Sequence, residues 1–478
     1  MKGNLIGGVW AGSASGRTRE RRNPANECEI VAVSPESDAT DAHEAVSAVA
    51  AGYREWADRG PEARAAVLNR AADIMAAQAD DLARELVREE GKTLAEALTE
   101  TRRTPVNLRF YAGEALRLAG STFATGDGSL VYTAREPVGV VVAITPWNFP
   151  LNIPSRKLGP ALAAGNGVVF KPSEVTPLMG QRLVEALVDA GIPAGALALV
   201  HGGGEIGAAL VADRRVAAVT FTGSYDVGAT IHRTVGPSQR CQLEMGGKNP
   251  VVVLDDADID RAADIITRGA FGLSGQACTG TSRVIVHDAV HDALVDRLIE
   301  AARSRRVGDG LSDGVHMGPL ATRAQLTKVR SYLELAAAEG AKLRAGDESL
   351  DEDLAHGYFT RPVVLTDVEA SSRLAQEEIF GPVLAVLRVA SFDEAVAVAN
   401  NTEYGLSAGI VTRDIGRALA FARNVDAGLV KVNQPTTGMA MNAPFGGLKN
   451  SSTQTFKEQA GDTMMHFYTV DKTVYVSP

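Results

Sequence analysis

Residues 138–145 read VGVVVAIT, an apolar run without the alternation of a half-buried strand. Such a run is typical of a strand buried on both faces of a parallel sheet. Similar runs follow at 165–171 (GNGVVFK), 196–202 (ALALVHG) and 216–223 (VAAVTFTG), and alanine-rich helical segments separate most of them. Because strands and helices alternate, we predict an α/β fold with a doubly wound parallel sheet.

A second strand–helix series begins near residue 246. Its apolar runs are NPVVVLD (249–255), SRVIVHD (282–288), PVLAVLRVA (382–390), SAGIVTRD (407–414) and GLVKVN (428–433). Residues 38–119 are rich in Ala, Arg and Glu with helical periodicity, which predicts amphipathic helices packed on a sheet. We therefore expect two doubly wound α/β domains, one built from residues 1–118 and 138–245 and one from residues 246–446.

The composition narrows the class of protein. The chain has 478 residues, of which 45% are apolar and 22% charged, as in an ordinary soluble globular protein. Its net charge of −10 argues against nucleic acid or an anionic membrane as a partner. Three cysteines, no apolar leader and no run of about 20 apolar residues predict a cytoplasmic protein outside the membrane. The eight histidines show no ligand spacing, so we expect no protein-bound metal.

Two glycine-rich segments could bind a phosphate group. GGGEIG at 202–207 fits the dinucleotide fingerprint G-x-G-x-x-G, with Asp226 about 20 residues further on. Asp226 does not stand at the end of the next strand, however, so the context that the fingerprint requires fails at the acid. FTGSYDVG at 221–228 is a second candidate, because a strand there runs into a helix start whose N–H groups attract anions. An ordinary strand-to-helix turn explains this segment equally well.

Cys278 lies among small residues in GQACTGTSR at 275–283. Taken alone, it is more readily explained as a buried structural residue, because free cysteine is one of the most buried residue types. The alternative is a nucleophile. The residue itself does not decide between the two, and the rest of the sequence must.

GQACTGTSR and seven other segments resemble the aldehyde dehydrogenase superfamily in their order and spacing, over nearly the whole chain. The seven are ITPWNFPLNIPSRKLGPALAAGN (144–166), FKPSEVTP (170–177), FTGSYDVG (221–228), LEMGGKNP (243–250), EEIFGPV (377–383), EYGLSAG (403–409) and PFGG (444–447). The resemblance implies NAD(P)-dependent oxidation of an aldehyde to a carboxylate. It makes the structural explanation of Cys278 improbable.

The resemblance also implies roles for individual residues. Cys278 matches the family nucleophile, whose thiolate attacks the aldehyde to give a thiohemiacetal and later a thioester. Its backbone N–H and the Asn148 side-chain amide would hold the oxyanion. Glu244, in LEMGG, matches the general base that activates the hydrolytic water. Gln276 and Thr279 are expected to line the substrate pocket.

Cofactor contacts are implied in the same way. The residues that match them are Ile144, Thr145, Pro146 and Trp147 at a strand end, Lys171, Ser173 and Glu174 at the adenosine ribose, Gly223 and Ser224 at the pyrophosphate, and Glu378 and Phe380 at the nicotinamide side. A carboxylate at Glu174 would accept bonds from the ribose hydroxyls and repel a 2′-phosphate, which favours NAD. Lys171 adjoins the same site, so NADP is also compatible.

Arg156 bears on the choice of aldehyde. It follows Asn148 by eight residues, just over two helical turns, in an otherwise apolar segment. A surface arginine, or one neutralised by a nearby acid, is the alternative reading of the residue alone. With an arginine at this position, the chain resembles semialdehyde dehydrogenases. The planar guanidinium group of arginine suits a distal carboxylate on the substrate.

The C-terminal segment from PFGG onward resembles 2-oxoglutarate semialdehyde (2,5-dioxopentanoate) dehydrogenases. We therefore predict oxidation of 2-oxoglutarate semialdehyde to 2-oxoglutarate, with succinate semialdehyde as the near alternative. A CoA-acylating relative is disfavoured by Glu244. A catalytically silent scaffold or binding protein is disfavoured because Cys278, Glu244 and Asn148 occur together.

The family resemblance assigns functions to the expected domains. Residues 1–118 and 138–245 would bind NAD(P), and residues 246–446 would be catalytic. Residues 119–137 and 461–478 resemble an oligomerisation arm, so we expect a homodimer or homotetramer.

Overall fold

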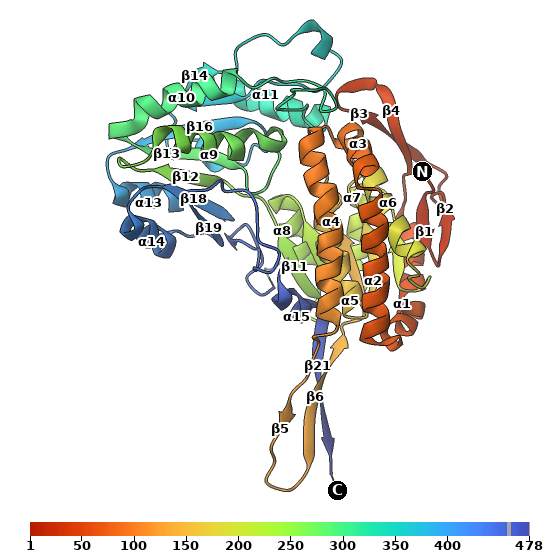
Figure 1. Cartoon of the computed structure of the whole chain (residues 1–478). Helices are drawn as coiled ribbons and strands as arrows, with labels where there is room; N and C mark the ends of the chain where they lie inside the picture. The colour runs from red at the N-terminus through yellow and green to blue at the C-terminus, as the bar shows by residue number, and fades with distance from the viewer. Residues whose placement is uncertain (457–459, 478) are drawn as a thin grey trace.

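The computed structural model describes residues 1–456 and 460–477, so Pro478 of the expected arm lies outside the described residues. Two seven-stranded sheets with helices packed on them form the body, and a narrow three-stranded arm projects from it (Figure 1). The predicted α/β class is confirmed.

The first sheet has the strand order β11-β10-β7-β8-β9-β1-β2. Its central strands are parallel, whereas β1 and β2 form an antiparallel edge. In chain order the strands are β1 (Asn4–Ile6), β2 (Val9–Ala11), β7 (Val140–Ile144), β8 (Gly167–Lys171), β9 (Leu197–Leu199), β10 (Val216–Thr222) and β11 (Arg240–Glu244). β11 (RCQLE) was not among the predicted strands, because its polar residues hide the apolar pattern.

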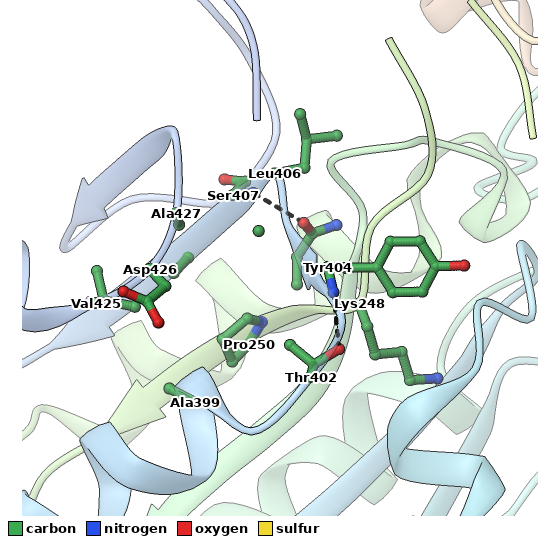
Figure 2. Close-up of a pocket in the computed structure, with 13 residues that line it drawn as sticks. Lys248, Pro250, Ala399, Thr402, Tyr404, Leu406, Ser407, Val425, Asp426 and Ala427 are labelled. Carbon is green, nitrogen blue, oxygen red and sulfur yellow. Dashed lines mark hydrogen bonds between the residues drawn. The ribbon is translucent and has the colours of Figure 1, made fainter. Parts of the chain in front are cut away.

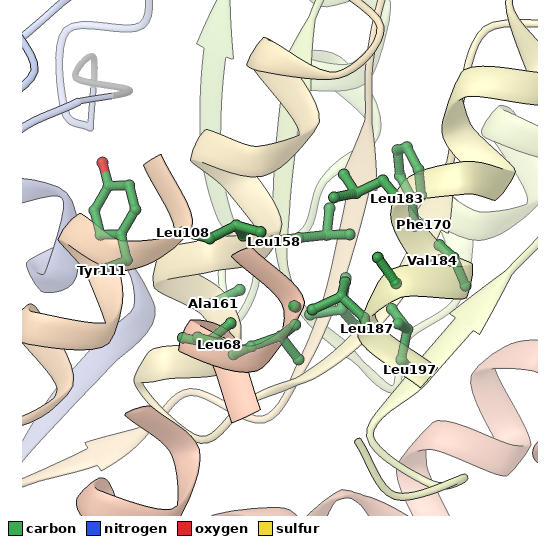
Figure 3. Close-up of a cluster of buried hydrophobic side chains, with 14 of the residues drawn as sticks. Leu68, Leu108, Tyr111, Leu158, Ala161, Phe170, Leu183, Val184, Leu187 and Leu197 are labelled. Carbon is green, nitrogen blue, oxygen red and sulfur yellow. The ribbon is translucent and has the colours of Figure 1, made fainter. Parts of the chain in front are cut away.

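Helices cover both faces of this sheet, as its continuous apolar strands require. They are α1 (Ala39–Asp58), α2 (Gly60–Ala77), α3 (Ala79–Glu90), α4 (Leu94–Ala115), α5 (Asn152–Ala163), α6 (Pro177–Asp189), α7 (Gly204–Ala212) and α8 (Tyr225–Thr234). On β8, Val168 and Phe170 pack with α2, α4, α5 and α6, while Val169 packs with α1 and α7 on the opposite face. Figure 3 shows the first of these clusters, in which Phe170 lies beside Leu183 and Val184 of α6.

The second sheet has the order β14-β15-β16-β13-β12-β18-β19, parallel apart from β14 at its edge. Its strands are β12 (Asn249–Val253), β13 (Thr281–His287), β14 (Lys342–Ala345), β15 (Val363–Thr366), β16 (Val383–Val389), β18 (Ser407–Val411) and β19 (Leu429–Val432). Its helices are α9 (Ile259–Phe271), α10 (His291–Arg303), α11 (Arg323–Ala338), α12 (Arg373–Gln376), α13 (Phe392–Asn400) and α14 (Ile415–Asn424). β14 (KLRA) and β15 (VVLT) were not among the predicted strands.

The remaining elements are short. β5 (Thr122–Phe123), β6 (Leu130–Pro137) and β21 (Thr469–Val476) form the arm, in which the last strand pairs antiparallel with β6 along its whole length. Two-stranded pairs join β3 (Thr18–Asn23) to β4 (Asn26–Pro35) and β17 (Tyr404–Gly405) to β20 (Leu448–Lys449). The helix α15 (Met465–Tyr468) precedes β21, and four 3₁₀ turns lie at 272–275, 288–290, 352–354 and 462–464.

Three neighbouring strands of the first sheet end at one edge. β7, β10 and β11 are parallel neighbours, and their last residues are Ile144, Thr222 and Glu244. The carboxyl ends of parallel strands are where open α/β sheets bind ligands. This edge therefore brings the predicted cofactor and base residues together.

Replacement of Phe170 by alanine tests the core between the first sheet and α6. Phe170 is fully buried, and its loss should lower the free energy of unfolding by about 3–5 kcal/mol. Urea unfolding measures this change. Leu419→Ala on α14 is the control, since that side chain is 56% exposed and should change the free energy by no more than about 0.5 kcal/mol. Equal losses in the two variants would contradict this account of the core.

Candidate active site

Cys278 lies in the loop between α9 and β13, immediately after a tight turn. Leu273 and Ser274 in that turn have φ angles of 53° and 54°, the left-handed region that non-glycine residues seldom adopt. The Cys278 side chain is partly exposed and faces a cavity of about 180 Å³. Burial and the negative charge of Glu378 raise the pKa of Cys278 to about 12, while Arg156 acts to lower it. The resting thiol is therefore protonated, and a base must take its proton before attack.

Asn148 follows β7 and lines the same cavity as Cys278. Its side chain is buried, and Nδ2 donates a hydrogen bond to the backbone carbonyl of Gln276 at 2.9 Å. A primary amide carries two N–H groups, so this bond fixes the amide and leaves the second N–H for a ligand. The geometry suits a donor to an oxygen atom bound at Cys278.

The Gln276 side chain makes hydrogen bonds to the backbone, and the substrate-lining role of Gln276 and Thr279 stays a prediction. The Gln276 amide accepts a bond from the Ala321 N–H at 2.9 Å and donates to the Leu273 carbonyl at 3.2 Å, so it secures the loop. Neither Gln276 nor Thr279 is among the described residues that line the cavity of Cys278. The part of Gln276 that contacts the site is its backbone carbonyl, which accepts the hydrogen bond from the Asn148 side-chain amide.

Glu244 ends β11 and is 1% exposed. Its Oε1 accepts a hydrogen bond from the Ser452 hydroxyl at 2.6 Å. Burial raises the pKa of Glu244 well above its usual range, although Ser452, Lys157 and Arg156 act against that rise. Its charge in turn raises the pKa of Cys278, which places the two groups in one electrostatic environment. A carboxyl group with a raised pKa is a stronger base when ionised, which suits proton exchange with water or thiol.

A larger cavity of about 640 Å³ adjoins that of Cys278. The residues that line both are Pro146, Trp147, Thr222, Gly223 and Ser224. The larger cavity alone is lined by Ile144, Thr145, Lys171, Ser173, Glu174, Gly204, Gly207 and Asp226, among others. Residues of both glycine-rich segments therefore face one space.

The groups around this space fit a dinucleotide. Lys171 Nζ lies 3.7 Å from Glu174 Oε2 at one end, where a ribose would find both a donor and an acceptor. α8 begins at Tyr225, directly after Ser224, and no side chain caps its N-terminus. The N–H groups of its first turn are therefore available to a phosphate, whereas the Gly223 N–H donates to the Glu244 carbonyl at 3.0 Å. A Cβ atom at Gly223 would lie 2.4 Å from the Phe221 ring, which explains the glycine.

Glu378 and Phe380 line the cavity near Cys278, opposite Trp147. The rings of Trp147 and Phe380 meet edge to face with centroids 5.4 Å apart, and Glu378 Oε1 accepts a bond from the Gly247 N–H at 3.0 Å. Two residues of α11 that the sequence analysis missed hold this loop. Lys328 donates to the Glu378 carbonyl at 2.9 Å, and Gln325 donates to the Ile379 and Phe380 carbonyls. Their spacing of three residues is the only signal, and a solvated helix face shows the same pattern.

Arg156 lies on α5 and is 5% exposed. Its guanidinium stacks on the Phe445 ring at 5.5 Å and contacts the sulfur of Met439. Phe445 belongs to a small apolar cluster against which both Met439 and Cys278 pack, so Arg156 contacts the same cluster as the nucleophile. No carboxylate in residues 1–456 and 460–477 lies within 4 Å of Arg156. Adjacent Lys157 turns away and donates to the Thr220 hydroxyl at 2.8 Å.

A separate small cavity lies beside β18, between Lys248 and residues 399–427 (Figure 2). Its volume of about 10 Å³ holds about one water molecule, which is too small for a substrate. Across the part of the chain that the structure describes, no group of three or more His, Cys, Asp or Glu side chains could hold a metal ion. The same residues contain no helix that is long and apolar enough to cross a membrane.

Comparisons with known proteins identify this arrangement. A profile of the "Aldehyde dehydrogenase family" matches residues 10–474. The chain is 44% identical to an alpha-ketoglutarate semialdehyde dehydrogenase from Haloferax volcanii, over 99% of this chain and 98% of that protein. It is 43% identical to a 2,5-dioxopentanoate dehydrogenase from Saccharolobus solfataricus, over 95% of each.

A solved structure agrees with the sequence relatives. Betaine aldehyde dehydrogenase from Staphylococcus aureus in complex with NAD⁺ superposes with a TM-score of 0.96 at 33% identity, over 99% of this chain and 94% of that one. The names of these proteins are those of aldehyde dehydrogenases, and the solved structure is a complex with NAD⁺. The chain belongs to the aldehyde dehydrogenase family and is an aldehyde-oxidising oxidoreductase that uses NAD or NADP.

Proposed function

We propose that this enzyme oxidises 2-oxoglutarate semialdehyde to 2-oxoglutarate. The observation that carries the proposal is Arg156, a buried cation beside Phe445 and Met439 that has no carboxylate within 4 Å among the described residues. A buried charge of this kind is costly unless an anion pairs with it. A distal carboxylate on the substrate would supply that anion. Relatives at 42–44% identity carry the names of 2-oxoglutarate semialdehyde and 2,5-dioxopentanoate dehydrogenases.

The reaction begins at Cys278. Its sulfur loses a proton and forms a bond to the aldehyde carbon, so the carbonyl oxygen becomes an oxyanion. The second N–H of Asn148 and the backbone N–H of Cys278 stabilise that oxyanion, which lowers the barrier. A nicotinamide ring bound beside Glu378 and Phe380 would supply the acceptor for the hydride of that carbon. Cys278 is then left as a thioester.

Glu244 completes the cycle. As a carboxylate it takes a proton from a water molecule, whose oxygen attacks the thioester carbon. Asn148 again holds the oxyanion, the carbon–sulfur bond breaks, and the carboxylate product leaves. Phe445 and Met439 supply apolar contacts beside Arg156, which would hold the distal carboxylate.

Succinate semialdehyde is the second candidate substrate. It carries the same distal carboxylate and lacks one carbonyl-bearing carbon. Arg156 serves either substrate, so the comparison of their kcat/KM values decides between them. The names of the relatives favour the longer one.

The arm supports a proposal for assembly. Its exposed apolar side chains are Phe123, Leu130, Tyr475 and Val476, each between 48% and 73% exposed. Exposed apolar side chains on an open sheet favour contact with a second copy of the chain. We propose that the enzyme forms a homodimer or homotetramer, and light scattering of the purified protein would test this assembly. We also propose that the enzyme is cytoplasmic.

Cys278→Ser should reduce aldehyde oxidation to below about 1% of the native rate, because a serine hydroxyl is a far weaker nucleophile than a thiolate. NADH formation at 340 nm measures the rate, and calorimetric titration with NAD measures binding, which should stay within about twofold. Substantial remaining oxidation would mean that the nucleophile lies elsewhere. Cys241→Ser is the matched control and should retain full activity.

Arg156→Ala should lower kcat/KM for carboxylate-bearing aldehydes about 100-fold more than for propanal, because it removes a buried charge-assisted contact. The ratio of the two losses is the readout, since Arg156 also lowers the pKa of Cys278 and therefore affects every aldehyde. Equal losses for both substrates would remove Arg156 from substrate recognition.

Activity should increase as the pH rises above neutrality. The pKa values of Cys278 and Glu244 are both raised, so the fractions of thiolate and carboxylate increase as the pH rises toward those values. A profile of kcat from pH 6 to pH 9 measures this. Glu244→Gln should lower kcat and flatten the part of the profile that depends on the carboxylate. A kcat that falls with pH would contradict the assignment.

A further inference from the structure

Two carboxylates on α4 hold the two loops of the active site. Glu96 and Glu100 are four residues apart and therefore lie on the same face of the helix. Glu100 Oε1 accepts hydrogen bonds from the N–H groups of Leu151 and Asn152, at 2.9 and 3.0 Å, just after Asn148. Glu96 Oε1 accepts from the N–H of Leu273 at 2.7 Å, in the turn before Cys278. One rigid helix therefore contacts the backbone of both loops.

Lys92 makes a further contact, to the backbone of Asn148. It precedes α4, and its Nζ donates to Glu100 Oε2 at 2.6 Å and to the backbone carbonyl of Asn148 at 2.8 Å. The same Nζ lies 4.9 Å from the centre of the Phe149 ring. Burial acts to lower the pKa of Lys92, but the charges of Glu100 and Glu90 outweigh that effect and the pKa is raised. The lysine therefore stays charged although its side chain has no exposure.

The loop of Cys278 needs this support. The left-handed φ angles of Leu273 and Ser274 persist only where neighbouring groups hold them. Glu96 is itself fixed, because its Oε2 accepts from both the hydroxyl and the N–H of Thr93, at 2.8 and 2.9 Å. Together with the bond from Asn148 to the Gln276 carbonyl, these contacts close a ring of hydrogen bonds through α4 and both loops.

We propose that Lys92, Glu96 and Glu100 are positioning residues that set the distance between Asn148 and Cys278, and thereby the geometry of the oxyanion site. The inference rests on the proposed role of Asn148. None of the three lines the cavity of Cys278, so they act through the loops that they hold. A shift of about 1 Å in a catalytic group can cost about 100-fold in rate, which gives such contacts a measurable effect.

The test is a double-mutant cycle between Lys92→Met and Asn148→Ala. Lys92→Met should lower kcat about 10- to 100-fold, with the Kd for NAD and the KM for the aldehyde within about twofold. In the Asn148→Ala background the same change should lower kcat less than about twofold, because the amide to be positioned is gone. Lys92→Arg should recover part of the rate.

Three outcomes separate the possible errors. If Lys92→Met costs the same factor with and without Asn148, it acts by another route and the positioning role is wrong. If Asn148→Ala alone costs less than about threefold, the oxyanion role fails, and the positioning inference fails with it. If Lys92→Met does not fold, Glu96→Gln gives the second cycle from the Cys278 side, with a drop in kcat of about 3- to 10-fold expected and no loss of kcat as the contradicting result.

Asp41→Asn is the matched control. Asp41 is 2% exposed on α1 and accepts backbone N–H bonds from Ala14 and Asp38, both at 3.0 Å, away from both loops. This variant should lower Tm while kcat stays within about twofold. If its kcat falls as far as that of Lys92→Met, general destabilisation explains both and the positioning role is wrong.

Discussion

The hydrogen bond from the Asn148 side chain to the Gln276 carbonyl joins the two halves of the active site. Asn148 follows a strand of the first sheet, whereas Gln276 lies in the loop that leads into the second. The two sheets form separate cores, so the distance between nucleophile and oxyanion donor depends on contacts across their boundary. This bond is the most direct of those contacts. Its place explains why a buried amide, rather than a mobile side chain, stands beside Cys278.

Arg156 links substrate recognition to the nucleophile. It is buried against Phe445 and Met439, and its charge acts to lower the pKa of Cys278. If the substrate carboxylate binds there as proposed, it neutralises part of that charge. The base at Glu244 then becomes more important for ionising the thiol, because less help comes from Arg156. Recognition and ionisation are therefore not independent in this site.

The sequence predicted the elements that form from a local pattern of apolar residues. Apolar runs such as residues 138–145 and 216–223 indicated buried parallel strands, because every side chain there meets a packed face. β11 was not predicted, because the segment RCQLE is polar. It is a strand because it pairs with β10. Family motifs pointed to Glu244, yet its burial follows from that pairing. The hydrogen bond to the Gln276 carbonyl was not predicted, because the sequence does not say whether a residue contributes its side chain or its carbonyl.

The first sheet draws part of its core from the far end of the chain. Met464, Met465, Phe467 and Tyr468 pack in the same cluster as α2, α4 and α5, and the Tyr468 carbonyl accepts a bond from the Asn166 side chain at 2.9 Å. During synthesis on the ribosome, α1 to α4 emerge some 350 residues earlier than these side chains. The second sheet, whose strands all lie within residues 249–432, can assemble before that. The half of the enzyme that is made first is therefore the last to close its core.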